Sequence, residues 1–348
     1  MRIPVEKLRA FMVEAAVRLP LKREYAEAMV DNLITANTWG VNSHGVGRYP
    51  VYMKRLSKDL VNREPQIIVT HRYPAVMTID GDNGLGSVVM MRALDETISA
   101  ADQFGIAAAA VKGSNHFGAA GYYCKLAADR GYISLLCTVG PANMPPFGGM
   151  EPYFSTNPLA MGIPSPDGEH IIVDMATSMA AKGKIRECAR KHEPIPLGWA
   201  IDKDGNPTTD AQAAVDGLVL PMSGHKGSGL ALLIEAMAGV ISGSAFGTEV
   251  VMQYGDETRP ANVGHSLIVI RPDGYLDKEA YTARLRRFCD ELHAIAPAKG
   301  FERVILPGEK ERMTCTQVME QGINIDDALY AQLQEIAAKS GIAMPDAI

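Results

Sequence analysis

Residues 39–56 bring together side chains whose types and spacing could do chemistry on a small acid. His44, Arg48 and Tyr52 follow one another at four-residue intervals, after a glycine-punctuated turn. In an α-helix such residues share one face. Histidine exchanges protons near neutral pH, and the planar guanidinium of arginine matches a carboxylate. The spacing predicts a helix face on which His44 acts as an acid, Arg48 holds a carboxylate and Tyr52 orients the substrate. The structural alternative is a polar interface helix.

A second histidine motif, "KGSNHFGAAGYY", spans residues 112–123. It follows a short apolar run typical of a buried strand and opens a helical segment, so it places His116 at the carboxyl end of a strand. Ligands bind at such ends in open α/β sheets. Glycines near the histidine would let a ligand approach the backbone. We therefore favour a functional site over a core or surface histidine.

Two further segments could hold the phosphates or ribose of a cofactor. In "VDMATS", Asp174 ends a predicted strand, and Thr177 and Ser178 follow; helix capping is the structural alternative. In "MSGHKGSGLALL", a glycine-rich loop carries His225, Lys226 and Gly227 into an apolar helix. The amides of a helix N-terminus together with a lysine favour an anion.

These groups suit the reduction of a 2-keto acid by a hydride donor, which needs a phosphate cradle, a proton donor and a carboxylate clamp. The "GDNGLG" segment at 81–86 has the order GxxGxG rather than GxGxxG, and no acid ends the next predicted strand, so an ordinary Rossmann site is disfavoured. No GxSxG or HExxH motif is present, and the five cysteines lack metal-ligand spacing. We therefore expect no metal site.

The elements that must position these residues change along the chain. The first sixty residues show helical apolar spacing, with Gly40 as a C-cap and a third helix capped by Asn42 or Ser43. From about residue 75, short apolar runs alternate with helical segments, which predicts an α/β fold with a largely parallel or mixed sheet covered by helices. We expect a helical region at 1–74, packed with C-terminal helices from 278–348, and a central cofactor-binding domain at 75–277.

Composition narrows the class of protein. The net charge is −6 and no basic stripe occurs, so nucleic acid is not an expected partner. The charged N-terminus and the scattered odd number of cysteines predict a reducing, cytoplasmic location. The longest apolar stretch, residues 229–247, is interrupted by Glu235 and by glycines, which favours a buried helix over a membrane span.

Taken in order, the motifs resemble one family over nearly the whole chain. "NSHGVGRYPVY", "SNHFG", "FSTNPLA", "VDMATS", "PIPLGWAIDKDGNPTTD", "GHKGSGLAL" and "PGE" together look like the type-2 malate/L-lactate dehydrogenase family. The resemblance implies an NAD- or NADP-dependent homodimer with a non-Rossmann cofactor domain. It also implies hydride transfer between nicotinamide and a small 2-hydroxy or 2-keto acid such as malate, lactate, sulfolactate or ureidoglycolate.

The resemblance also implies roles for particular residues. His116 and His44 match acid/base positions, with a slight preference for His116 as the acid, and Arg48 and Tyr52 match substrate contacts. The motifs and the resemblance together give a cofactor-binding set: Gly140, Asp174, Met175, Ala176, Thr177, Ser178, His225, Lys226, Gly227, Pro307, Gly308 and Glu309. Gly140 and His225 replace a polar residue and a proline found in ureidoglycolate-type members.

Three alternatives to a 2-hydroxy-acid dehydrogenase would use the same pocket. They are a cyclic imino-acid reductase, a diketo-sugar-acid reductase and a catalytically inactive binding protein. The intact set of His44, Arg48, His116 and Lys226 speaks against the inactive protein.

Overall fold

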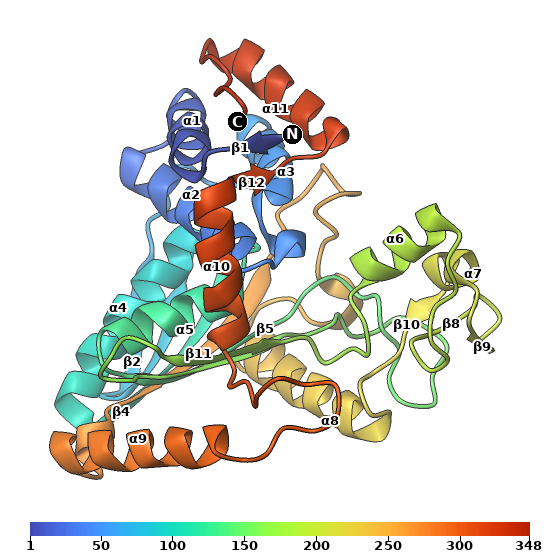
Figure 1. Ribbon diagram of the computed structural model, residues 1–348. Coiled ribbons are helices and arrows are strands. Elements are labelled where there is room, and N and C mark those ends of the chain that lie inside the picture. Colours follow the sequence, from blue (N-terminus) through green and yellow to red (C-terminus); the bar gives the residue numbers. More distant parts are fainter.

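A seven-stranded mixed sheet forms the centre of the computed structural model, which describes all of residues 1–348 (Figure 1). Its strand order is β2-β3-β4-β11-β5-β6-β7. The strands are β2 (Ile68–Tyr73), β3 (Val76–Asp80), β4 (Ile106–Ser114), β5 (Ile133–Thr138), β6 (Leu159–Ile163), β7 (Ile171–Met175) and β11 (Val263–Ile270). Only β3 and β4 are parallel neighbours. Of the two predicted sheet types, the mixed one is therefore correct.

The sheet is mixed because β11, late in the sequence, enters between β4 and β5 and runs antiparallel to both. In the same way β6 separates β5 from β7 and opposes each. Strands β3, β4, β5 and β7 therefore point in one direction although most of them are not neighbours. Their carboxyl ends lie along one edge of the sheet, which is where the predicted site residues follow them.

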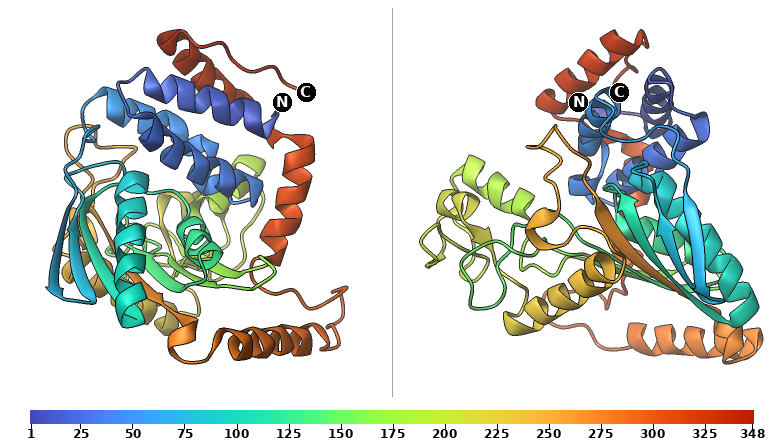
Figure 2. Two further views of the ribbon diagram at one scale, coloured as in Figure 1. Left: turned by 90° about the vertical axis from the view of Figure 1, so that its left-hand side faces the viewer. Right: turned by 180° about the vertical axis from the view of Figure 1, so that it is seen from behind.

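Helices cover both faces of this sheet, since alternate strand residues point to opposite sides. Leu136 belongs to the core under α4 (Gly86–Phe104) and α5 (Ala120–Asp129), seen in front of the strands in Figure 2. The next residue, Cys137, packs instead with α8 (His225–Ile234) and the π-helix η3 (Glu235–Val240). The "GDNGLG" segment is a turn from β3 into α4.

Gly86 is required where α4 begins. A Cβ atom at this position would lie 2.2 Å from the Asn115 carbonyl oxygen and 2.6 Å from the backbone of His116. The start of α4 therefore presses directly against the segment that carries the second histidine motif. The glycines of 81–86 serve close packing at this point.

The N-terminal helices form a separate core with the end of the chain. α1 (Val5–Val17), α2 (Arg23–Thr38) and α3 (Tyr49–Ser57) pack with α11 (Asp327–Ser340), while β1 (Arg2–Ile3) pairs with β12 (Ile323–Asn324). α10 (Glu309–Gln321) contacts α2. Gly40, with φ +79°, follows α2 as the predicted C-cap.

By contrast, α9 (Lys278–His293) lies at the opposite end of the molecule from α1–α3 (Figures 1 and 2). The N-terminal core contains residues of α11 and its preceding strand but none from α9. The division into 1–74 with 278–348 and a central 75–277 unit remains a proposal, and α9 is the part of the C-terminal segment that does not contribute to this core.

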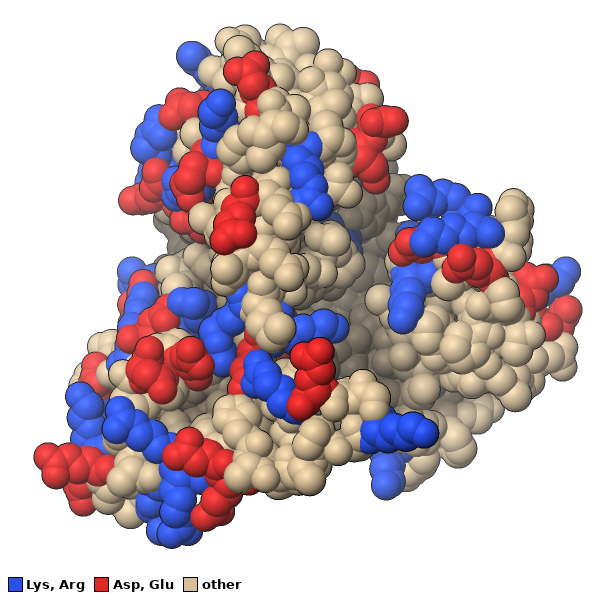
Figure 3. All heavy atoms as spheres, in the orientation of Figure 1, with Lys and Arg blue, Asp and Glu red and all other residues tan.

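A small lobe stands to one side of the sheet. It comprises α6 (Lys182–Lys191), α7 (Ala211–Asp216) and the three-stranded sheet of β8 (Ala200–Ile201), β9 (Pro207–Thr208) and β10 (Leu218–Val219), around its own hydrophobic cluster. Figure 3 shows a hollow between this lobe, on the right, and the helical part of the molecule at the upper left, with basic side chains gathered over α6. Short 3-10 turns η4 (Gly247–Glu249) and η5 (Pro272–Gly274) flank β11.

The apolar stretch at 229–247 forms α8 and η3, but it is buried on one side only. Glu235 and Ala238 are buried, whereas Leu232, Leu233, Val240 and Ile241 are exposed, Ile241 by 70 % of its surface. The prediction of a buried helix is therefore wrong for this outer face, because the helix packs on one face of the sheet with one side and leaves its other side uncovered. No helix of the chain has the length and apolarity that crossing a membrane requires.

Candidate active site

The segment that carries the first histidine motif is not one helix. His44 ends a 3-10 turn, η1 (Asn42–His44), Arg48 ends a second, η2 (Val46–Arg48), and only then does α3 begin. The Asn37 side chain accepts the Val46 N–H at 2.5 Å and fills the space where a Cβ on Gly45 would lie. This contact holds Gly45 extended and interrupts the helix. The prediction of a single helix face capped by Asn42 or Ser43 is therefore wrong.

The predicted side chains nevertheless meet, because the second histidine motif approaches the first. The rings of His44 and His116 are stacked, with centroids 5.5 Å apart and planes at 15°. The Tyr52 hydroxyl lies 2.5 Å from Nδ1 of His116. His116 follows β4 at the carboxyl edge of the sheet. Residues 72 positions apart in the chain thus form one cluster between α3 and the sheet.

Hydrogen bonding fixes the proton of His116. Nδ1 accepts the Gly118 N–H at 3.1 Å. A backbone amide can only donate, so Nδ1 carries no proton in the neutral ring and Nε2 carries it. Tyr52 then donates its hydroxyl to the same nitrogen. Burial raises the pKa of Tyr52 well above its ordinary value, so this hydroxyl remains a donor.

Both histidines are neutral at pH 7 in the free protein. Burial, with a smaller contribution from the charge of Arg48, lowers the pKa of His44 to about 4. The same two causes, followed by His44 and His265, hold the pKa of His116 well below its ordinary value. In the unfolded chain these rings take up protons near pH 6.5. Their contribution to stability is therefore present above pH 6.5 and is lost as the pH falls towards 4.

Arg48 is held on two sides. Its Nε donates to the Ser43 carbonyl at 2.7 Å, and its Nη1 donates to the Tyr254 hydroxyl. The guanidinium carbon also lies 5.1 Å from the centre of the Tyr254 ring. Nη2 makes no hydrogen bond within the chain and remains open to a carboxylate. Sequence reasoning missed Tyr254, because 206 residues separate it from Arg48 and no motif marks it.

The predicted cofactor segments converge along β7. Asp174 and Met175 end this strand, and the Asp174 carboxylate accepts the Gly121 N–H at 2.7 Å. Asp174 is exposed as a residue, but the protein around its carboxylate excludes water, and this burial raises its pKa to about 6.

Other predicted cofactor segments lie beside the same strand. The Ile172 N–H donates to the Pro307 carbonyl at 3.2 Å, which brings residues 307–309 next to β7. Ala176 follows it, and the Met222 N–H bonds the Thr177 carbonyl at 2.8 Å, so the loop before α8 lies close by.

Several of the predicted cofactor side chains already have partners. The Thr177 hydroxyl donates to the Thr156 carbonyl at 3.0 Å, and the Ser178 hydroxyl to the Ala180 carbonyl at 2.9 Å. The Glu309 carboxylate is buried against His293 and Arg303, each at 2.5 Å. Gly308, at φ +96°, turns the chain into α10. At these positions a ligand would meet mainly the backbone.

The remaining predicted residues lie at the ends of β5 and α8. Gly140 follows β5, and a Cβ there would lie 2.6 Å from the Ser155 hydroxyl oxygen. At the first turn of α8, His225 and Lys226 are exposed, while Gly227 is buried against the backbone of Met222. Lys226 forms no ion pair, so its charge is available to an anion. No group of three His, Cys, Asp or Glu side chains is placed to hold a metal ion.

Comparison with known proteins gives this arrangement a family. The fold and site are those of an α/β protein with a histidine pair at a sheet edge. The family described as malate/L-lactate dehydrogenase matches residues 3–334, and the chain belongs to this family. The L-sulfolactate dehydrogenase of Methanocaldococcus jannaschii is 37 % identical over 343 residues, which cover 99 % of this chain and 98 % of that protein. The ureidoglycolate dehydrogenase (NAD(+)) of Escherichia coli K12 is 34 % identical, over 96 % and 95 %.

Solved structures agree with this assignment. The sulfolactate dehydrogenase from Methanocaldococcus jannaschii superposes with a TM-score of 0.93 at 36 % identity, covering 98 % of each chain. The delta1-piperideine-2-carboxylate reductase from Pseudomonas syringae gives a TM-score of 0.85 at 29 % identity, covering 97 % of this chain and 100 % of that one. The chain therefore has the fold of enzymes named both as hydroxy-acid dehydrogenases and as an imino-acid reductase.

Proposed function

We propose that this protein is an NAD(P)-dependent oxidoreductase that transfers a hydride between nicotinamide and a small 2-hydroxy or 2-keto acid. The supporting observation is the stacked His44–His116 pair, with Tyr52 on one ring and Arg48 beside it, at the carboxyl edge of the sheet. Relatives named malate, sulfolactate and ureidoglycolate dehydrogenases make a 2-hydroxy acid the expected substrate class.

The nicotinamide cofactor, when bound, supplies or accepts the hydride. The protein handles the proton and the carboxylate. In the reduction, protonated His116 gives the proton on Nε2 to the 2-oxygen as charge develops there, and the ring keeps its second proton on Nδ1. In that state the Tyr52 hydroxyl rotates to accept from Nδ1, whereas in the resting ring both Tyr52 and the Gly118 N–H donate to the bare Nδ1. His44, stacked on the ring, assists.

Arg48 has the chemistry of the carboxylate clamp. Two of its nitrogens are held by Ser43 and Tyr254, which leaves Nη2 and the free N–H of Nη1 for a substrate carboxylate. An end-on pair of N–H groups matches the two oxygens of that group. The arginine that would bind the substrate carboxylate is therefore oriented before the substrate arrives.

A panel assay tests the proposal. Malate, lactate, sulfolactate and ureidoglycolate are offered with NAD and with NADP, and nicotinamide absorbance is followed. A cyclic imino acid is offered with each reduced cofactor, because the piperideine-carboxylate reductase shares the fold. We expect turnover of at least one hydroxy acid. Turnover of the imino acid alone would favour the reductase, and no turnover at all would contradict an enzymatic role. Relatives are named with both NAD(+) and NADP(+), so both cofactors are required.

The cofactor site gives a mutational prediction. Lys226→Ala should weaken NAD(P)H binding by about ten- to a hundredfold, since a hydrogen bond to a charged group contributes ~1.5–3 kcal/mol. The side chain is exposed at the start of α8, so the variant should fold normally. Fluorescence titration measures the Kd, with Lys7→Ala on exposed α1 surface as the control. Equal Kd values for both variants would remove Lys226 from the site.

We further propose a cytoplasmic homodimer. Four exposed residues on α8, on η3 and directly after it form the kind of apolar surface that a second copy would cover: Leu232, Leu233, Val240 and Ile241. Sedimentation at micromolar concentration should give twice the chain mass, and Ile241→Glu should shift the protein towards monomer. A monomeric wild type would refute the dimer, whereas a dimer that tolerates Ile241→Glu would place the interface on another surface.

A further inference from the structure

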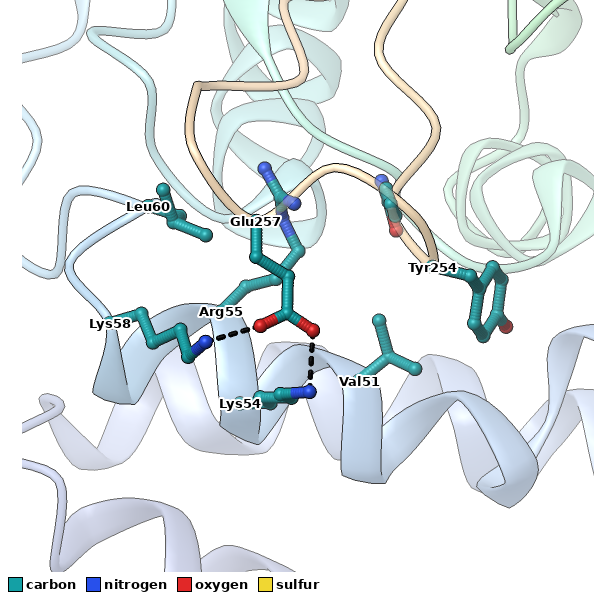
Figure 4. A pocket seen from close by; sticks show the side chains of 8 residues that line it. Val51, Lys54, Arg55, Lys58, Leu60, Tyr254 and Glu257 are labelled. Atoms are coloured by element: carbon teal, nitrogen blue, oxygen red, sulfur yellow. Dashed lines mark hydrogen bonds and ion pairs between the residues drawn. The ribbon is translucent and has the colours of Figure 1, made fainter.

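Residues 250–262, between η4 and β11, form a loop that folds back onto α3. Arg55 of α3 is almost fully buried and donates from Nη1 to the Asp256 carbonyl and from Nη2 to the Arg259 carbonyl, each at 2.9 Å. Figure 4 shows the Glu257 carboxylate between Lys54 of α3 and Lys58, which directly follows this helix; it lies 2.5 Å from Lys54 and also pairs with Lys58. The loop is thus fastened to α3 at its backbone and by its charge.

These attachments surround a small polar pocket of about 180 Å³, lined in part by Lys54, Arg55, Tyr254 and Glu257 (Figure 4). The lysine and arginine charges in it are already engaged by the loop. The pocket therefore has no unpaired basic group to offer a ligand, and its lining residues hold the loop in place against α3. Tyr254 is one of these lining residues, and its hydroxyl contacts Arg48.

Helix α3 connects the anchoring of this loop to the active site. Tyr52, which bonds His116, stands three residues before Arg55 on the same helix. Residues three apart on a helix are close neighbours. Because Tyr52 and Arg55 lie on one helix, α3 holds the contact with His116 and the contact with the 250–262 loop at a fixed separation. The position of Tyr254 in this loop is therefore set relative to His116.

We propose that Tyr254 is a positioning residue that holds the Arg48 guanidinium ready for the substrate carboxylate. This rests on the proposed function. Its hydroxyl accepts from Nη1 and its ring lies against the guanidinium, while Nη2 stays free. An arginine side chain loses considerable rotamer freedom on binding a ligand, and fixing it beforehand reduces that cost. Tyr254 is 55 % exposed as a residue, so burial does not explain its placement.

Tyr254→Phe tests the hydroxyl while keeping the ring. We expect KM for the best 2-keto acid to rise about fivefold, the size of one lost hydrogen bond, with kcat within about twofold and the Kd of NAD(P)H unchanged. Tyr275→Phe is the matched control, because this tyrosine is exposed and its hydroxyl makes no hydrogen bond within the chain. A residue that mattered only for stability would not separate KM from kcat and from cofactor binding.

A double-mutant cycle tests the link to Arg48. Lysine lacks the fork that bonds Tyr254 and a carboxylate together, so Tyr254→Phe should add nothing in an Arg48→Lys background. Glu257→Gln, which weakens the anchor, should raise KM in the same direction by about twofold. Additive effects of Tyr254→Phe and Arg48→Lys would overturn the proposal, as would an unchanged KM in Tyr254→Phe.

Binding of oxamate, an unreactive analogue of a 2-keto acid, separates this inference from the proposed function. Calorimetry in the presence of NADH or NADPH should give a Kd about fivefold higher for Tyr254→Phe than for wild type. If the wild type binds oxamate in this way but turns over no acid, the function fails and the positioning role stands. If the wild type is active and oxamate binds both proteins equally, the positioning role fails. Absence of oxamate binding to the wild type would also overturn it.

Discussion

Replacing His116 with asparagine should lower kcat for the best substrate by ~10²–10⁴ and leave the Kd of NAD(P)H unchanged. Asparagine retains a hydrogen-bonding side chain but cannot exchange a proton near neutral pH. His116 is the ring that Tyr52 and Gly118 fix at Nδ1, which leaves Nε2 for the substrate. Because the acid acts only as charge develops on the oxygen, its loss should appear in kcat.

His44→Asn provides the contrast. A residue that only assists should show a smaller loss, shared between kcat and KM. Its partner is the Ser43 hydroxyl, 2.9 Å from Nδ1, which can donate or accept, so the neutral His44 ring can carry its proton on either nitrogen. A larger kcat loss in His44→Asn than in His116→Asn would exchange the two roles. His71→Asn, on the exposed strand β2, is the matched control. Near-wild-type kcat in both site variants would show that these motifs do not form the active site.

The same assignment determines the pH dependence. The pKa of His116 is lowered well below 6.5 by burial and by Arg48, so the free enzyme holds a neutral ring at pH 7. Reduction needs the protonated ring, so its kcat/KM should rise as the pH falls from 8 towards 6. Oxidation needs the neutral ring with its proton on Nδ1 and Nε2 bare. Because the two neutral forms interconvert without net uptake of protons, its kcat/KM should stay level over that range and fall only in more acidic solution. A reduction rate that rises with pH would contradict the assignment.

The second large effect concerns Arg48. Arg48→Lys keeps the charge but loses the planar fork, and we expect KM to rise by about ten- to a hundredfold with a much smaller change in kcat. The clamp holds the carboxylate in the ground state and in the transition state alike, and loss of such uniform binding appears in KM. The lysine would also lose the bonds to Ser43 and Tyr254.

Arg284→Lys on the exposed surface of α9 is the matched control for this substitution. A fall in kcat with KM unchanged would mean that Arg48 acts mainly in the transition state. If both kcat and KM were unchanged in Arg48→Lys, the substrate carboxylate would bind elsewhere, and the panel assay would then be repeated with uncharged analogues.

The sequence predicts the elements here better than their arrangement. The helical spacing at 86–104 and the apolar run before His116 reflect local periodicity, and α4 and β4 form at those places. The order of strands does not follow from periodicity. β11 lies between β4 and β5 and pairs with both in the antiparallel sense, which makes the sheet mixed. These pairings join residues far apart in the chain, so local periodicity does not encode them.

The same distinction applies to the site. Residue chemistry pointed to His44 and His116 separately, and the fold brings the rings together. The expected helix through 44, 48 and 52 does not form, because the Asn37 side chain intervenes at Gly45 through a contact that sequence spacing does not encode. Tyr254 could not be predicted either, since only the anchoring of its loop by Arg55 places it beside Arg48.

Direct transfer of label tests the central claim most closely. The hydroxy acid that gives the best rate is deuterated at C2 and mixed with enzyme and oxidised cofactor, and the reduced nicotinamide is analysed by mass spectrometry and NMR. Hydride transfer predicts one deuterium on the nicotinamide ring and none lost to water, at a rate much reduced in His116→Asn. Deuterium released to solvent, or product formed without labelled nicotinamide, would contradict the account.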